Sequence, residues 1–259
     1  MEDVFSTHLH NGTGATQTIT NDIDLAVKGG LVWIKQRSGT QDHNLFDTIR
    51  GTNTYIRTNS TGANNPGGAY TDLLTSFNAN GFTLGADAST AGFVNNSGTF
   101  ASWTFRKQPK FFDIVTFTSG GVKTHALGSV PGAIILKRTD VAEGWYIVHS
   151  ASNGFLQFNT AAAVGTTMPG IATTGAWINS TTTTFDVTNF WTTGGTYVAY
   201  LFAHNAGGFG LTGTDNVISC GSYTGNGSTS GPTINLGYEP QYVLIKRADS
   251  TGDWYVMDT

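Results

Sequence analysis

The stretch "LGSVPGAIILKRTD", residues 127–140, returns later in the chain as "LGYEPQYVLIKRAD", residues 236–249. Leu, Gly, Pro, Lys, Arg and Asp occupy the same columns without a gap, and the four positions before each Lys stay apolar or aromatic. A fainter copy, "LAVKGGLVWIK", residues 25–35, places Gly30 over Gly132 and Lys35 over Lys137. Short apolar runs bounded by Gly or Pro predict buried strands, so the sequence predicts one strand built three times.

The segments around these runs repeat as well. "HNLFDT" follows the first run, "WYIVHS" the second and "WYVMDT" the third, so that Trp145 and Trp254 share a column. Upstream, "VFSTHLHNGTG" (residues 4–14) aligns with "FFDIVTFTSGG" (111–121) and with "VISCGSYTGNG" (217–227). Each unit is therefore expected to open with a strand and a Gly-rich turn. A period near ~100 residues is too long for a solenoid and is typical of tandem domains.

The composition predicts an all-β protein. With 34 Gly, 12% aromatic and 12% charged residues, the chain is rich in turn formers and poor in the residues that favour helices. Short strands separated by Gly, Asn and Ser are typical of antiparallel β-sandwiches, and we expect tandem sandwiches of the jelly-roll kind.

Three units are predicted, at residues 1–108, 109–212 and 213–259, strung like separate beads with linkers at 107–110 and 205–215. The third unit has the apolar run and the Trp hairpin but lacks more than half of its strands. An unfinished sheet exposes an unpaired edge. We therefore expect the chain to continue, or a neighbouring chain to complete the sheet.

Patterns within the strands predict which side chains are buried. "NNSGTFASWTFRK" (95–107) overlays "TTGGTYVAYLFAH" (192–204), and the alternation over residues 100–105 predicts a strand with one buried face. Pro131 and Pro240 precede their apolar runs, as expected for proline at a strand's entry. The Lys that ends each run, at 35, 137 and 246, is expected where a buried strand reaches solvent.

Charge and targeting features exclude several classes of partner. A net charge of −4 with scattered Lys and Arg argues against a nucleic-acid groove. The N-terminal segment lacks a basic region followed by an apolar one, so neither a cleaved signal peptide nor membrane insertion is expected. The single cysteine, Cys220, is expected in a strand as a small buried residue, and it cannot form an intrachain disulfide.

The sequence contains no recognisable catalytic or metal motif. Asp22 and Asp24 alternate in "NDIDLA" but are expected in an exposed turn, and Asp47 is expected to pair with Arg50. No strand carries the facing acidic residues of a glycosidase, and no G-x-S-x-G is present. The six histidines are dispersed and are expected at the surface, so no catalytic residue, metal or cofactor is predicted.

Tryptophans supply the only candidate ligand contacts. Those in alternating strands are expected in the core. Trp177 and Trp191 lie near Thr-rich loops, where an aromatic ring could stack on the face of a sugar. These two residues are the predicted ligand-binding residues.

Three segments carry a resemblance to a known group of proteins: "GGLVWIKQRSGTQDHNLFDTIRG" (29–51), "GFTLG" (81–85) and "NNSGTFASWTFRK" (95–107). They resemble the tandem repeats of tail-fibre and related virion proteins of tailed bacteriophages. The resemblance implies concanavalin A-like β-sandwich units and supplies no catalytic residues. The middle unit departs from the pattern, with "VHSASNG" where the first unit has "FDTIRG".

The resemblance implies a non-enzymatic structural protein of a phage virion, in a tail fibre or tail tip that attaches to the host surface. Other virion proteins are then the expected partners, a host-surface glycan the expected ligand, and a homotrimer the expected assembly by analogy with fibres. The protein would be made in the host cytoplasm and reside in the virion. Two alternatives stay open: a capsid-surface decoration protein, and a secreted carbohydrate-binding or carbohydrate-active sandwich domain.

Overall fold

The computed structural model describes residues 4–65, 68–88, 93–118, 120–152, 154–165, 179–188 and 194–259. Within these ranges every regular element is a strand and none is a helix, which confirms the all-β class. The strands in chain order are β1 (Phe5–Asn11), β2 (Gln17–Thr20), β3 (Gly30–Gln36), β4 (Asn44–Asp47), β5 (Tyr55–Arg57), β6 (Leu74–Asn78), β7 (Gly81–Leu84), β8 (Thr99–Arg106), β9 (Phe112–Thr118), β10 (Val122–Thr124), β11 (Pro131–Arg138), β12 (Trp145–His149), β13 (Phe155–Gln157), β14 (Thr184–Asp186), β15 (Thr196–Ala203), β16 (Tyr242–Lys246) and β17 (Trp254–Asp258).

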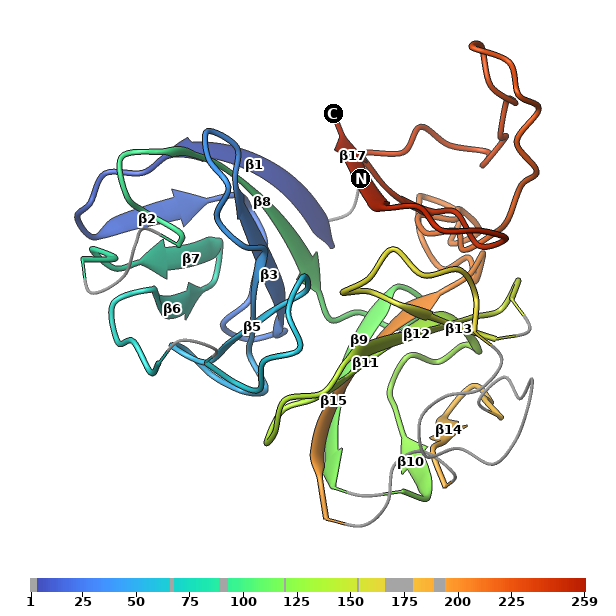
Figure 1. Ribbon diagram of the computed structural model, residues 1–259, viewed down its shortest axis with the longest axis horizontal. Coiled ribbons are helices and arrows are strands. Elements are labelled where there is room, and N and C mark those ends of the chain that lie inside the picture. Colours follow the sequence, from blue (N-terminus) through green and yellow to red (C-terminus); the bar gives the residue numbers. More distant parts are fainter. Residues whose placement is uncertain are drawn as a thin grey trace.

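The strands of the first unit form two antiparallel layers (Figure 1). One sheet has the order β1-β8-β3-β4-β5, and the smaller one has the order β2-β7-β6. The first inner core fills the space between them and consists of Ile19, Ile23, Leu25, Val32, Ile34, Phe46, Tyr55, Leu73, Leu74, Phe82, Leu84, Phe93, Val94 and Phe100. Burying a side chain of this kind contributes about 1.5–3 kcal/mol, so this core is what holds the layers together.

The second unit has the same main sheet. Its order is β13-β12-β11-β15-β9, and the β10-β14 pair lies over one face. The second inner core lies between them and consists of Phe117, Leu127, Ile134, Leu136, Tyr146, Val148, Phe155, Phe185, Val187, Tyr197, Ala199, Leu201 and Ala203.

The strand registers match the sequence alignment of the first two units. Trp33 pairs with Trp103 across β3 and β8, and Ile135 pairs with Tyr200 across β11 and β15. The opening quoted run thus forms β11, with Pro131 as its first residue, as expected for a proline at a strand entry. Equivalent sequence positions occupy equivalent ladder positions, which allows contacts to be compared unit by unit.

The third unit contributes one hairpin. Lys246 pairs with Trp254 across β16 and β17 just as Lys137 pairs with Trp145 across β11 and β12. The predicted opening strand at residues 217–227 is wrong, because this segment forms no strand. Cys220 therefore lies outside any strand; burial raises the pKa of its thiol to about 12, which leaves it unreactive.

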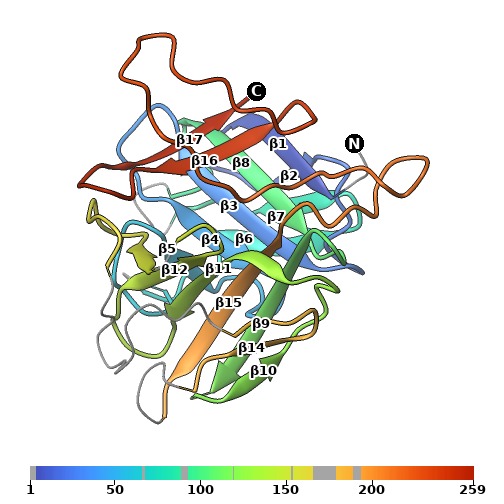
Figure 2. The same ribbon diagram turned by 90° about the vertical axis from the view of Figure 1, so that its right-hand side faces the viewer.

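The outer faces of the two main sheets pack against each other and against the third hairpin. The junction core between them consists of Val4, Leu31, Trp33, Leu45, Ile56, Ala101, Trp103, Phe105, Phe111, Phe112, Ile114, Ile135, Trp145, Ile147, Leu156, Phe158, Val198, Tyr200 and Phe209, with Tyr242, Leu244, Trp254 and Val256 of the hairpin packed on it. Figure 2 shows the β16-β17 hairpin beside β1, β8 and β3, where Tyr242 contacts Phe5 and Trp33.

This shared core corrects two expectations. The units are not separate beads, because one apolar cluster runs through all three, and Phe209 in the predicted linker 205–215 is itself 2% exposed. The strand at 100–105 is also buried on both faces: Phe100 faces the first inner core while Trp103 faces the junction core. The alternating pattern in the sequence separates the two faces of this strand. It could not show that the second unit covers the outer face. The domain boundaries stay a prediction.

A glycine within β3 is required by the close approach of its neighbour. A Cβ at Gly30 would overlap the backbone carbonyl oxygen of Phe105 on β8. We expect Gly30→Ala to lower the free energy of unfolding by about 1–3 kcal/mol, because the two strands would have to separate. Gly225→Ala is the control, since a Cβ there meets open space and the change should stay within about 0.5 kcal/mol. Urea unfolding of both variants measures this; equal midpoints for the two would contradict it.

Candidate functional site

The predicted ligand residues Trp177 and Trp191 lie outside the described residues. Asp22 lies exposed in a turn with a φ of 62°, and the Asp24 carboxylate accepts a hydrogen bond from the Val27 amide at 3.0 Å. Both positions are those of a turn.

The predicted Asp47–Arg50 pair is confirmed, and it lies at the boundary between units. Arg50 Nε lies 2.6 Å from Asp47 Oδ2, and the two side chains are 5% and 0% exposed. Tyr200 of the second unit donates from its hydroxyl to Asp47 Oδ2 at 2.7 Å and accepts from Arg50 Nη2 at 3.1 Å. Burial opposes the charge on Arg50, but Asp47 and Tyr200 hold its pKa above the ordinary value. This cluster joins the units and shows no catalytic arrangement.

Two histidines predicted at the surface are buried. His10 and His125 are each 9% exposed, and burial lowers the pKa of both. His10 donates to the Val94 carbonyl at 3.2 Å and stacks on Phe100. Among the described residues, no three His, Cys, Asp or Glu side chains lie close enough to share a metal ion. The same part of the chain holds no helix of the length and apolarity that crossing a membrane requires.

Lys137 is fully buried between the first and second units. Its ammonium donates to the carbonyls of Thr61, Arg138 and Glu143 at 3.1, 2.8 and 2.8 Å, and Thr61 belongs to the first unit. Burial lowers the pKa of Lys137 to about 8, and the carbonyls replace the water that its charged form loses. The prediction that this Lys reaches solvent is wrong, because a turn of the neighbouring unit covers it.

Trp145 lies beside Lys137 and is covered by the same segment. Its indole Nε1 donates to the carbonyls of Arg57 at 2.8 Å and Ser60 at 3.1 Å. We call a Lys and its ladder partner on the neighbouring strand a seat. In the first seat, Lys137 and Trp145 receive the strand end and turn at residues 57–61.

The same seat occurs between the third and second units. Lys246 Nζ donates to the Ala161 carbonyl at 3.3 Å, and Trp254 Nε1 donates to the Gln157 carbonyl at 3.0 Å. Gln157 pairs with the second strand of its hairpin in the register that Arg57 has in the first unit. The second seat, Lys246 and Trp254, is thus filled by residues 157–161 as the first is filled by residues 57–61.

A second repeated contact closes the arrangement. Tyr200 of the second unit donates to Asp47 of the first, and Trp103 of the first donates from Nε1 to Asp258 of the third at 3.0 Å. Tyr200 and Trp103 hold the same ladder position, as do the two Asp residues. The second unit therefore sits on the first, the first on the third, and the third on the second. The three contacts form a closed cycle around the junction core.

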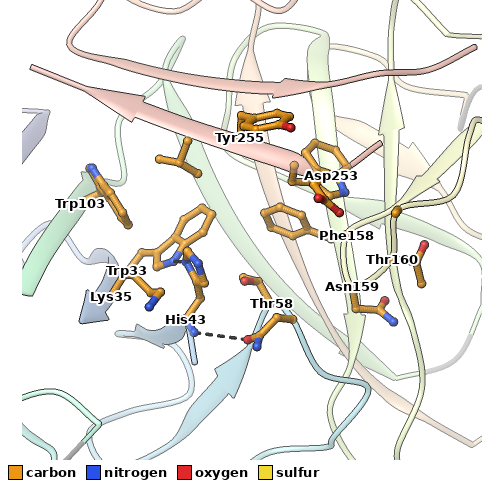
Figure 3. A pocket seen from close by; sticks show the side chains of 14 residues that line it. Trp33, Lys35, His43, Thr58, Trp103, Phe158, Asn159, Thr160, Asp253 and Tyr255 are labelled. Atoms are coloured by element: carbon orange, nitrogen blue, oxygen red, sulfur yellow. Dashed lines mark hydrogen bonds between the residues drawn. The ribbon is translucent and has the colours of Figure 1, made fainter. Parts of the chain in front are cut away.

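A cavity of about 540 Å³ opens where the three units meet (Figure 3). It is lined by Trp33, Lys35, His43, Thr58, Asn59, Trp103, Phe158, Asn159, Thr160, Ala161, Asp253, Trp254, Tyr255 and Val256. Asp253 is the one carboxylate among these lining residues, so they do not assemble the acid pair of a glycosidase. The cavity offers aromatic walls, amides and the donors of Lys35 and His43.

His43 presents an N–H donor in this cavity. Trp33 Nε1 can only donate, and it lies 3.0 Å from His43 Nδ1, so Nδ1 is the acceptor and the neutral ring carries its proton on Nε2. Burial, together with the charge of Lys35, lowers the pKa of His43 to about 4, so the ring is neutral at pH 7. In the sequence alignment His43 occupies the column of Trp145 and Trp254, whose indoles are also N–H donors. That shared column was the available signal in the sequence, and it was missed because His replaces Trp.

The lowered pKa of His43 predicts a pH-dependent stability. The unfolded chain protonates His43 near the ordinary pKa of 6.5, whereas the folded chain does so near 4. Between these values the unfolded state binds more protons, so stability falls as the pH drops through this window. We expect His43→Gln to lose less stability than wild type between pH 7 and pH 4, with a difference on the order of 2 kcal/mol in the free energy of unfolding. Urea unfolding at pH 7 and pH 4 measures it, with the exposed-site variant Lys28→Gln as control; parallel losses in wild type and His43→Gln would contradict it.

Comparisons with known proteins place the chain in a family. No curated protein and no solved structure matches it. The model of a family described as a domain of unknown function, DUF7483, matches residues 2–259. The chain therefore belongs to the DUF7483 family.

Proposed function

We propose that this protein is a non-enzymatic structural component of a bacteriophage virion, in a tail fibre or tail tip that contributes to attachment on a host-surface glycan. Its units are proposed to be sandwiches of the concanavalin A-like, jelly-roll kind. The starting point is the resemblance of residues 29–51, 81–85 and 95–107 to tail-fibre repeats. Other virion proteins are its proposed partners, within a homotrimer.

The observation that carries the proposal is the seat that occurs twice. Between the first and second units, and again between the second and third, a Lys and a Trp at equivalent positions donate to backbone carbonyls at equivalent positions of the neighbouring unit. The first seat joins its two units rigidly, since the fully buried Lys137 would be left charged and unpaired without its acceptors. Lys246 of the second seat makes the equivalent contact but is only partly buried. Rigid joints suit a part that transmits or resists force on a particle.

Imaging of intact virions tests the location. Antibodies raised against the purified chain should label the tail fibres or tail tip of the phage that encodes it. Label over the capsid surface would support a decoration protein instead, and particles without label would contradict a virion component altogether.

An activity assay tests the non-enzymatic part of the proposal. Purified protein should release no reducing sugar from host polysaccharide. Turnover that disappears on replacing Asp22 or Asp24 would contradict it and favour the carbohydrate-active alternative. A glycan array read with the same preparation tests attachment, with binding to a host-surface glycan as the expected result.

A further inference from the structure

The first unit has a seat that no segment of the described chain fills. In the sequence alignment Lys35 and His43 occupy the columns of the pairs Lys137–Trp145 and Lys246–Trp254. In the structure they lie one position beyond the last pair of the β3–β4 ladder, Ile34 with Asn44. Lys35 Nζ donates to the carbonyls of Gln36 at 2.7 Å and Gly39 at 3.3 Å, both within its own hairpin. His43 Nε2 has no hydrogen-bond partner among the described residues. Both side chains line the 540 Å³ cavity, which is the open third seat of the cycle (Figure 3).

The strand that fills a seat always comes from the same place in the neighbouring unit. β5 pairs with β4 and its following turn fills the first seat; β13 pairs with β12 and its following turn fills the second. In the third unit the strand equivalent to β4 and β12 is β17, and among the described strands it pairs only with β16, so that no described strand takes the place of β5 or β13. Four residues of β17 or its turn, Asp253–Val256, form one wall of the cavity. A strand added to the free edge of β17 would therefore lead into the open seat.

The opposite face of the third hairpin is uncovered as well; in the second unit the equivalent face packs on the second inner core. Tyr255 and Met257 are 59% and 51% exposed, whereas their equivalents Tyr146 and Val148 are 1% and 3% exposed. Apolar side chains that are buried at the same ladder positions of a complete unit are thus left open in the third.

The two filled seats define the chemistry of the occupant. Ile56 and Leu156 enter the junction core, and Asn59 and Asn159 follow three residues later in the turn. The carbonyl after each apolar residue accepts from the seat's Trp, and the carbonyl of Thr61 or Ala161 accepts from its Lys. In the open seat the corresponding donors are His43 Nε2 and Lys35 Nζ.

We propose that the cavity where the three units meet binds a polypeptide segment of the repeat's own type, with an apolar residue three positions before Asn, which adds to β17 as a strand and turns over Lys35 and His43. The main-chain hydrogen bonds to β17 give affinity, and the apolar pocket and the two donors give register. The inference concerns assembly of the three units and holds whether or not the protein belongs to a virion.

A synthetic peptide of residues 154–164, GFLQFNTAAAV, tests the seat on the whole protein. The peptide contains no Trp, and Trp33, Trp103 and Trp254 line the cavity, so binding is read as a saturable change in tryptophan fluorescence. A scrambled peptide of equal composition should not bind. Lys35→Met should weaken binding at least about tenfold, because it removes a charged hydrogen-bond donor, while Lys28→Met should leave it unchanged.

A tethered peptide removes the entropic cost of bringing two molecules together. Appending residues 151–164 after Thr259 supplies the segment at roughly millimolar effective concentration. The fusion should melt at a higher temperature than the parent chain, and Lys35→Met should abolish the gain while Lys28→Met keeps it. A fusion with no gain, or a gain that Lys35→Met leaves intact, overturns the proposal. A second result would also overturn the proposal: the parent chain associates with itself, Lys35→Met abolishes that association, and the peptide does not compete with it. The seat would then bind a second copy of the chain.

Discussion

Replacing Asp47 with alanine is expected to lower the free energy of unfolding by about 3–5 kcal/mol. Asp47 is fully buried, lies 2.6 Å from Arg50 and accepts from the Tyr200 hydroxyl at 2.7 Å. Without the carboxylate, the Arg50 guanidinium keeps its charge in a side chain that is 5% exposed. An unpaired buried charge of this kind costs more than the pair contributes, which is why the effect is large.

Two controls separate this effect from loss of a side chain in general. Asp249→Ala breaks the exposed pair with Arg247, whose side chains are 61% and 79% exposed, and should leave the unfolding midpoint unchanged. Tyr200→Phe removes the hydrogen bonds of the hydroxyl to Asp47 and from Arg50 and should lower the free energy of unfolding by about 1–3 kcal/mol. The Asp47→Ala, Tyr200→Phe double variant should then fall short of the sum, because both changes act on one cluster. A loss for Asp47→Ala no larger than for Asp249→Ala would contradict the account.

Trp145→Ala is expected to cost about 3–5 kcal/mol, the range for truncating a large buried aromatic side chain. Trp145 is completely buried in the junction core and donates to two carbonyls of the first unit. The change therefore leaves a cavity between units as well as two unmet acceptors. Urea unfolding followed by far-UV circular dichroism measures it.

Trp254→Ala is the matched control for this prediction. Trp254 makes the same contact to Gln157 but is only partly buried, because its own unit supplies one hairpin. Trp254→Ala should lower the free energy of unfolding by about half as much as Trp145→Ala or less, since the Trp254 side chain buries less apolar surface in the folded protein. Equal losses of stability for the two substitutions would show that the contribution of a seat does not depend on how deeply its Trp is buried, and would contradict this prediction.

The sequence predicted the repeated strands well, apart from the opening strand of the third unit at residues 217–227, because its signals are local. The run before Lys137 became β11, its copy before Lys246 became β16, and the alignment of Trp103 with Tyr200 matches the strand registers. Apolar runs bounded by turn residues report a strand's own preference for burial.

The contacts between units could not be predicted from the same signals. Lys137 looks like a residue at a strand exit, and only the carbonyl of Thr61, far away in the chain, makes its burial tolerable. The face of Trp103 could equally have met solvent or another unit, since alternation does not distinguish them. His43 did not look like a donor site, because its role follows from the tautomer that Trp33 imposes.

Differential scanning calorimetry of the intact chain tests the central claim, that the three units share one core and interlock in a cycle. The account predicts a single transition whose calorimetric and van't Hoff enthalpies agree, because no unit can unfold without exposing the junction core. Asp47→Ala and Trp145→Ala should move that whole transition to lower temperature. Two or more resolved transitions, with each variant shifting only one of them, would mean that the units fold as independent beads and would contradict the account.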